Sequence, residues 1–302
     1  MTKSCHKNFW NEVRKVTKSS KGCPLTNSNI DGYYNDEDIS NAFAAKLKCL
    51  LNADNCLNSR SDLLHSIEET LSHSDLESSV VSPEDVAEAL SRIKPGKSDG
   101  TELISNHFLY AKSILNDFLS KLFTAMLRHG YIPQCLRDCV LQPIPKPGKD
   151  PTDSDNYRAI ALAPTLSKVF EWCVLLTNKS AFATSPLQFG FKEGLSTDLC
   201  TGLIKNVVAK YITNETAVYG CFLDASKAFD RVNHTLLFEK LCNKNLSPAV
   251  TRTLLSWYSQ QVCVRWNASH SEKFPVGNGV RQGGVLSPIL FTVYIDDLLY
   301  QL

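Results

Sequence analysis

The sequence has no apolar run of the roughly 18 or more residues that a membrane-spanning helix needs. Its N-terminus, MTKSCHKNFW, also lacks the apolar stretch of a secretory signal peptide. Insertion into a membrane and secretion are therefore both disfavoured. We expect an intracellular protein with no membrane partner, in either the nucleus or the cytoplasm.

Two further features are scarce. The 11 cysteines include no C-x-x-C pair, which would begin a zinc site, and their odd number and scattered positions disfavour a disulfide framework. We therefore expect reduced thiols. An excess of positive charge is also missing, because 32 lysines and arginines stand against 31 aspartates and glutamates. Any binding of nucleic acid must then come from local basic patches.

What the sequence contains is a polar first part followed by a more regular second part. Residues 1–80 are rich in Ser, Asn and Asp, and we interpret them as a loosely packed, partly helical leader without a chemical motif. At Ser82 a serine N-cap followed by proline and two acidic residues indicates a helix start. Residues 81–302 then combine helical segments, among them 113–129 and 199–211, with short strands. This pattern predicts a domain of the α+β class.

Residues 140–149, VLQPIPKPGK, form a segment of a different kind. Three prolines stand among residues that favour strands, and proline cannot donate a hydrogen bond within a central strand. We predict an edge strand that runs into an exposed basic turn.

A short apolar run at residues 217–223 ends abruptly at Asp224. Because nearly every position in it is apolar, we predict a strand covered on both faces, with the carboxylate at its exit. A carboxylate held there can coordinate Mg²⁺ through oxygen. The alternative is an aspartate that caps a helix beginning near Ser226, and Asp224 taken alone favours that alternative.

The residues around Asp224 favour the metal site. Residues 222–232 read FLDASKAFDRV, which resembles the first catalytic motif of the reverse transcriptases of non-LTR (LINE-type) retrotransposons. The resemblance implies that Asp224 is a catalytic Mg²⁺ ligand and that Ala225 lies against the incoming dNTP. It also implies that Phe229 is the steric gate against a ribose 2′-hydroxyl, although ordinary core packing would suit this ring too. We interpret Asp230 as a structural acid.

Two more segments are similar to nucleotide-binding motifs of this family. The turn PKPGK, followed by NYRAIAL at residues 156–162, resembles the fingers motif in which a lysine and an arginine hold the triphosphate, here Lys146 and Arg158. These groups suit a polyphosphate, although a solvated basic turn is the alternative. Residues 279–288, GVRQGGVLSP, resemble the motif that places Gln282 and Gly283 under the nucleotide. Paired glycines there would let the backbone approach a ligand closely.

The resemblance covers residues 81–302. Residues 188–197, QFGFKEGLST, are similar to an element that packs against template and fingers, and residues 93–100, IKPGKSDG, are similar to the start of the fingers. The implied architecture is the fingers and part of the palm of a right-hand polymerase. The implied partners are an RNA template, a DNA primer and dNTP, with two Mg²⁺ ions in the intact enzyme.

Residues 294–297, YIDD, look like the Y-x-D-D box that supplies the second carboxylate pair in polymerases of this kind. Asp296 follows Pro288 within about two helical turns, which is too short to finish a helix and enter a hairpin. We therefore predict that residues 294–297 belong to a buried helix, and that the sequence lacks the catalytic hairpin and the thumb. Two-metal phosphoryl transfer needs carboxylates from separate strands. We expect an RNA-directed DNA polymerase (nucleotidyltransferase) fragment that is inactive as it stands.

Two other functions are open at this point. The first is a domesticated, non-catalytic module that binds nucleic acid or protein. The second is an active polymerase that uses Asp296 and Asp297. An F/Y-A-D-D box encoded beyond Leu302 would favour the fragment, and a splice junction to an unrelated domain would favour the module. Primer extension that is lost on Asp296→Ala would favour the active polymerase.

Overall fold

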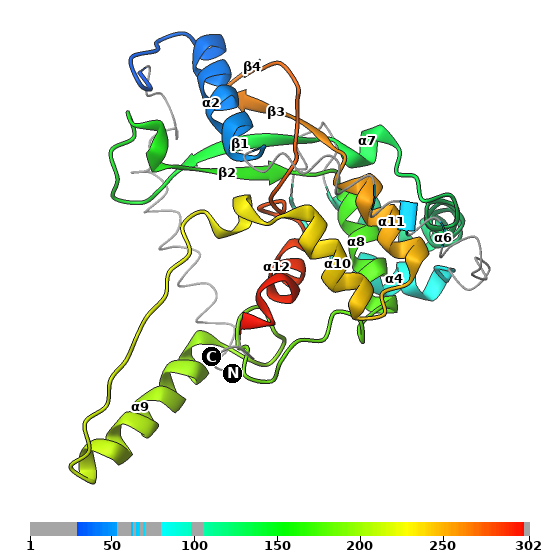
Figure 1. Cartoon of the computed structure of the whole chain (residues 1–302). Helices are drawn as coiled ribbons and strands as arrows, with labels where there is room; N and C mark the ends of the chain where they lie inside the picture. The colour runs from blue at the N-terminus through cyan, green and yellow to red at the C-terminus, as the bar shows by residue number, and fades with distance from the viewer. Residues whose placement is uncertain are drawn as a thin grey trace, which may run out of the picture.

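The computed structural model describes residues 29–52, 80–97 and 105–298, together with the isolated positions 62, 65, 66 and 69. It combines helices with a mixed sheet, which confirms the predicted mixture of α and β structure (Figure 1). The helices are α2 (Asp36–Leu50), α4 (Pro83–Ser91), α5 (Ser105–Tyr110), α6 (Lys112–His129), α7 (Gln134–Arg137), α8 (Thr165–Thr177), α9 (Thr197–Thr213), α10 (His234–Asn243), α11 (Pro248–Trp257) and α12 (Ser287–Ile295). The strands are β1 (Cys139–Pro145), β2 (Tyr157–Leu162), β3 (Gln261–Trp266), β4 (Ser269–His270) and β5 (Phe274–Pro275), and short 3₁₀ turns are η2 (Ser154–Asn156) and η3 (Ala228–Arg231).

The sheet has the strand order β2-β1-β3-β4, with β5 also paired to β3. Strands β1 and β2 form an antiparallel hairpin, while β1 and β3 are parallel. The prediction of an edge strand is therefore wrong for the first half of β1, which lies between two neighbours. It fails there because β3 pairs with Cys139 to Leu141. It holds for the second half, because Pro143 and Pro145 fall on a stretch that has β2 alone as its partner.

Helix α2 packs across the sheet and belongs to its core (Figure 1). The ring of Phe43 lies 5.2 Å from the ring of Tyr157 and 5.4 Å from that of Trp266, measured between centroids. Asn35 caps the helix by accepting the amide of Glu37. The expectation of a loosely packed leader is therefore wrong for residues 29–52, whereas the domain boundary at residue 80 stays a prediction. The sequence reasoning failed because the apolar face of α2 is short and its sheet partners lie far along the chain.

A second, larger core joins most of the other helices. Helix α4 starts as predicted, with a reciprocal pair of hydrogen bonds between Ser82 and Asp85, and it packs against α6 and α8. The stacked rings of Phe170 and Trp257, 5.3 Å apart, join α8 to α11. The helices expected at residues 113–129 and 199–211 are confirmed as α6 and α9 with slightly wider bounds.

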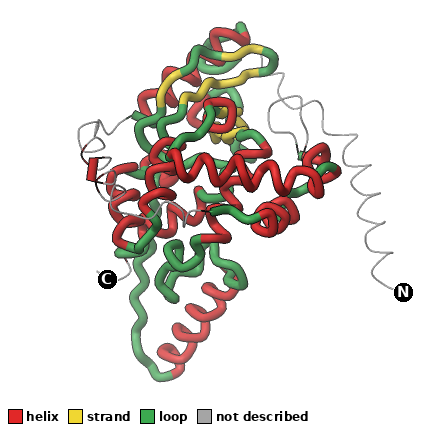
Figure 2. Tube along the Cα trace, turned by 90° about the vertical axis from the view of Figure 1, so that its right-hand side faces the viewer, coloured by secondary structure: helices red, strands yellow, loops and turns green. Residues whose placement is uncertain are grey.

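The strand predicted for residues 217–223 does not form, and this expectation is wrong for the structure. Residues 216–225 have no regular secondary structure, and Phe222 and Leu223 are 91% and 77% exposed. A strand needs a neighbour for its backbone hydrogen bonds, and the described residues provide none beside this segment. The segment and α9, which buries none of its residues, project together from the body of the protein (Figures 1 and 2).

The described helices include none that is both long and apolar enough to cross a membrane.

Candidate nucleotide-binding site

A cavity of about 210 Å³ lies between α2, the hairpin β1–β2 and the turn at η3. Four cationic side chains line it against two carboxylates, so the local balance is positive although the whole chain is nearly neutral. The charged lining residues are Lys46, Lys146, Arg158, Lys227, Asp155 and Asp230. A cavity with this excess of cations suits an anion.

The hairpin places two of the predicted phosphate-binding residues in this cavity. Pairing of Ile144 with Arg158 sets the register, and Lys146 follows directly after β1. The backbone amide of Lys146 donates a 2.7 Å hydrogen bond to the carbonyl of Asn156, and its Nζ donates to the carbonyl of Asp155 at 2.9 Å. Arg158 is exposed and forms no ion pair with any described residue, so its guanidinium is available to a ligand.

Asp230 forms part of the opposite wall. Burial raises the pKa of its carboxyl, and the nearby Lys227 and a 3.5 Å hydrogen bond from Gln282 offset part of that rise. Lys227 has a left-handed backbone (φ 52°), which turns the chain into η3 two residues before Phe229. Its carbonyl accepts the amide of Asp230 at 3.0 Å. The interpretation of Asp230 as a structural acid did not anticipate that this residue lines the cavity.

The loop that carries Gln282 is held against β2. The backbone amide of Ala161 donates to the carbonyl of Gln282 at 2.7 Å, and Gly283 has a positive φ of 118°. A Cβ at Gly283 would lie 2.9 Å from the carbonyl oxygen of Ala161. The glycine thus allows close approach of protein backbone, whereas the approach of a ligand to Gly283 stays a prediction.

Two buried charged side chains, Glu171 and Arg281, hold the same loop in place. Glu171 on α8 accepts the backbone amides of Val285 and Leu286, the second at 2.9 Å, at the start of α12. Arg281 stacks over the ring of Trp257 at 4.8 Å and donates to the side chain of Gln260. The sequence reasoning missed Glu171, because only the fold brings α8 beside this loop.

Besides Gly283, three of the predicted site residues do not line the cavity. Asp224 and Ala225 lie on the exposed segment that replaces the predicted strand. Phe229 packs in an aromatic cluster, with ring centroids 5.9 Å from Phe191 and 5.0 Å from Phe291. None of the three lines the cavity that holds Lys146, Arg158 and Gln282.

The described residues do not fit a two-metal centre. They contain no group of three or more His, Cys, Asp or Glu side chains placed to hold a metal ion. Asp224 is exposed on a segment without a paired neighbour. An exposed, unsupported carboxylate provides neither the number nor the rigidity of oxygen ligands that bound Mg²⁺ requires.

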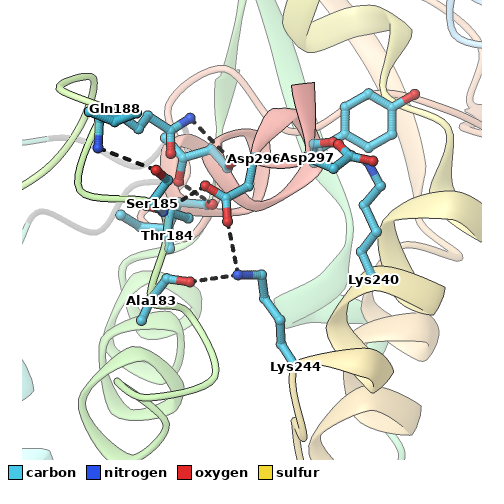
Figure 3. A network of polar contacts seen from close by, with 12 residues as sticks. Ala183, Thr184, Ser185, Gln188, Lys240, Lys244, Asp296 and Asp297 are labelled. Atoms are coloured by element: carbon cyan, nitrogen blue, oxygen red, sulfur yellow. Dashed lines mark hydrogen bonds and ion pairs between the residues drawn. The ribbon is translucent and has the colours of Figure 1, made fainter. Parts of the chain in front are cut away.

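The two aspartates of the YIDD sequence serve the packing of α12 (Figure 3). Asp296 ends the helix with helical backbone angles (φ −60°, ψ −36°) and is 5% exposed. It accepts the amide of Ser185 at 2.7 Å and forms an ion pair with Lys244 at 3.0 Å. Asp297 pairs with Lys240 at 2.7 Å on the surface. The predicted helix is confirmed for Tyr294 and Ile295, but the prediction of a buried helix is wrong for Asp297, because α12 ends at Ile295 and Asp296 and Asp297 form a turn in which Asp297 is exposed.

The QFGFKEG element packs onto the same end of α12. Gln188 (Figure 3) donates to the carbonyl of Thr292 at 3.3 Å, and Lys192 donates to the carbonyl of Thr184 at 3.0 Å and to that of Ser185. The element therefore contributes to the body of the fold through side-chain bonds to backbone carbonyls.

Comparison with known proteins connects this cavity to a family. The family described as reverse transcriptase (RNA-dependent DNA polymerase) matches residues 144–302, which include Lys146, Arg158 and Gln282. The chain belongs to the reverse transcriptase family. Within this family the relatives of the chain come from non-LTR retrotransposons, as the sequence motifs indicated.

Three relatives from flies illustrate the similarity. The RNA-directed DNA polymerase from mobile element jockey of Drosophila funebris is 32% identical over 72% of this chain and 24% of its own length. The probable RNA-directed DNA polymerases from transposon X-element and transposon BS, both of Drosophila melanogaster, are 29% and 30% identical over 96% and 94% of this chain. The chain spans about a third or less of each relative. It aligns with one region of each of these longer relatives.

Five of the residues that line the cavity lie outside the reverse transcriptase match, and Lys46 is the charged one among them. Lys46 on α2 precedes the matched residues, which begin at Ile144. No motif in residues 1–80 pointed to it, and only the packing of α2 on the sheet reveals its place.

Proposed function

We propose that this chain forms the fingers and part of the palm of an RNA-directed DNA polymerase from a non-LTR retrotransposon. In this proposal the cavity beside α2 binds the triphosphate of an incoming dNTP. Lys146 and Arg158 contact the phosphates, and Gln282 contacts the base or sugar edge. The wider reaction, copying of an RNA template onto a DNA primer, belongs to the longer polymerase.

One observation carries the proposal. Lys146 and Arg158 belong to one motif and Gln282 to another, and all three line the same cationic cavity. An arginine fork and a lysine ammonium are the groups that recognise phosphate oxygens. Membership of the reverse transcriptase family and the relatives' description as RNA-directed DNA polymerases support the same conclusion.

The roles of three other residues follow from the family motif and extend the proposal. Asp224 is the Mg²⁺ ligand, Ala225 lies against the nucleotide, and Phe229 is the gate against a 2′-hydroxyl. For these roles, residues 217–223 must form a strand beside a further strand, and Asp224 must gain other carboxylates. We therefore expect this chain alone to bind dNTP without extending a primer.

Binding and extension can be measured separately on the full chain. Titration calorimetry with dTTP and Mg²⁺ should show binding that weakens about tenfold or more in Arg158→Gln and in Lys146→Gln, because each loses a charge-assisted hydrogen bond. Lys149→Gln, in the same turn but outside the cavity lining, is the matched control and should bind like the wild type. Absence of dTTP binding by the wild-type chain would refute the proposal.

The extension assay uses a poly(rA) template, an oligo(dT) primer, dTTP and Mg²⁺. We expect no extended product. Product that disappears on Asp224→Ala would refute the proposed inactivity, and product that disappears on Asp296→Ala would show that Asp296 is catalytic and not structural.

A further inference from the structure

Lys46 reaches the cavity from a part of the chain that carries no polymerase motif. Its Nζ donates to Ser154 Oγ at 2.7 Å and forms an ion pair with Asp155 Oδ1, also at 2.7 Å. The side chain is 35% exposed, so solvent and ligands can reach the ammonium group. It therefore adds a cation to the wall beside Lys146 and Arg158.

The helix that carries Lys46 is rigidly placed. Ile39 and Phe43 are buried in the core of the sheet, on the side of α2 that faces away from solvent. Before the helix, Asp31 accepts the amide of Ser154 at 3.0 Å and donates its own amide to the carbonyl of Thr152 at 2.9 Å. The turn before β2 is thus fixed to the N-terminal side of α2, and Lys46 approaches that turn from a defined direction.

Asp155 contacts two of the cavity's cations through different oxygens. Its carboxylate receives the hydrogen bond from Lys46, which is the main cause of a lowered pKa, while its backbone carbonyl accepts Lys146 Nζ at 2.9 Å. The carboxylate side chain is 66% exposed. An ion pair in such an exposed position contributes little to stability, so Lys46 can exchange this partner for another anion at small cost.

We propose that Lys46 is a further phosphate-binding residue of the nucleotide cavity. In this inference, which rests on the proposed function of the cavity, a triphosphate oxygen replaces the Asp155 carboxylate as the partner of Lys46 Nζ. Phosphate carries more charge than a single carboxylate and accepts stronger hydrogen bonds from ammonium groups. The N-terminal helix would then contribute directly to nucleotide affinity.

The test compares full-length variants by titration calorimetry with two probes, dTTP and inorganic tripolyphosphate, each with Mg²⁺. Lys46→Gln should weaken binding of both probes about tenfold, because it removes one charge-assisted hydrogen bond to phosphate. Lys46→Arg keeps the charge and should restore most of the affinity. Lys48→Gln lies on the same helix, outside the cavity lining, and should bind like the wild type.

Asp155→Asn tests the exchange of partners. This variant removes the competing charge from Lys46, so we expect equal or tighter binding of both probes. Weaker binding would refute the proposal that phosphate and Asp155 compete for Lys46, and would mean that Asp155 positions Lys46. Near-ultraviolet circular dichroism should be the same in all variants, since Lys46 lies outside the packed rings of Phe43, Tyr157 and Trp266.

The outcomes separate the two proposals. If the wild-type chain binds neither probe, the function proposed for the cavity fails. If the wild type binds and Arg158→Gln binds weakly, while Lys46→Gln binds as tightly as Lys48→Gln, the cavity keeps its function and the inference about Lys46 is overturned.

Discussion

The amide of Ala161 on β2 donates a 2.7 Å hydrogen bond to the carbonyl of Gln282. This bond joins the hairpin that carries Arg158 to the loop before α12. Two motifs that lie more than a hundred residues apart in the sequence therefore meet through their backbones. The contact fixes how far Gln282 lies from the cations of the hairpin. The next residue, Gly283, allows the two backbones to lie this close, because it has no Cβ.

Substitution of Gly283 should loosen this contact. In Gly283→Ala the added Cβ would lie 2.9 Å from the carbonyl oxygen of Ala161, at a backbone φ of 118° that alanine strongly disfavours. We expect the free energy of unfolding in urea to fall by about 2 kcal/mol. Gly202→Ala on α9 is the control, because nothing lies within 4 Å of its Cβ, and a helical alanine should leave stability equal or higher. Equal stability of Gly283→Ala and wild type would contradict the proposed steric role.

Neighbouring aspartates at the end of α12 should differ sharply in their effect on stability. Asp296→Ala removes a buried carboxylate and leaves the Ser185 amide and Lys244 without this partner, so we expect a loss of about 2 to 3 kcal/mol. Asp297→Ala breaks a surface pair with Lys240 and should cost about 0.5 kcal/mol. Chemical denaturation measures both. Similar losses in the two variants would mean that Asp296 is not the structural residue of the pair.

The buried Glu171 should make stability depend on pH. Burial raises the pKa of its carboxyl above the ordinary 4.5, although Arg281 and the amides of Leu286 and Val285 oppose the rise. The folded protein therefore holds this proton more tightly than the unfolded chain does. The contribution of this group to the free energy of unfolding then falls as pH rises from about 4.5 to the folded pKa.

Glu171→Gln tests this dependence, because glutamine keeps an acceptor oxygen and does not ionise. Relative to the wild type, the variant should gain stability as pH rises through that window, measured by urea unfolding at several pH values. The exposed Glu272→Gln serves as the control and should follow the wild type. A constant difference between Glu171→Gln and wild type across the window would show that the buried carboxyl does not titrate there.

The exposed apolar residues before Asp224 should promote association. Phe222 and Leu223 are almost fully exposed to solvent. An exposed apolar segment of strand composition can pair with another chain. We expect the double variant Phe222→Ser and Leu223→Ser to reduce light scattering and the binding of a hydrophobic dye, with unchanged unfolding stability. Tyr34→Ser removes an exposed ring outside this segment, 71% exposed, and should change neither signal.

Local signals in the sequence predicted several elements well. The start of α4 depends on Ser82 and Asp85, which bond to each other within one turn, so their spacing suffices. The helical state of Tyr294 and Ile295 followed from the short distance between Pro288 and Asp296. The residues assigned to phosphate, Lys146 and Arg158, lie on one hairpin, and this local geometry preserves the relation that the motif implies.

Features that depend on distant neighbours could not be predicted. Residues 217–223 have the composition of a buried strand, but a strand forms only beside a partner, and none of the described strands pairs with them. Lys46 bonds to Ser154, 108 residues away, and nothing near Lys46 in the sequence marks that contact. Pro143 correctly predicted an edge position for its own part of β1, but it could not predict how far β3 extends along β1.

The packing of α2 sets a practical limit on how this polymerase region can be shortened. A recombinant protein trimmed to the family match, starting at Ile144, would lose Cys139 to Pro143 of β1 as well as the helix that covers Trp266. The aromatic side of the sheet would then face water, and one side of the anion cavity would be missing. Domain boundaries for expression should therefore be drawn before Ile30, whose side chain is fully buried in the same core.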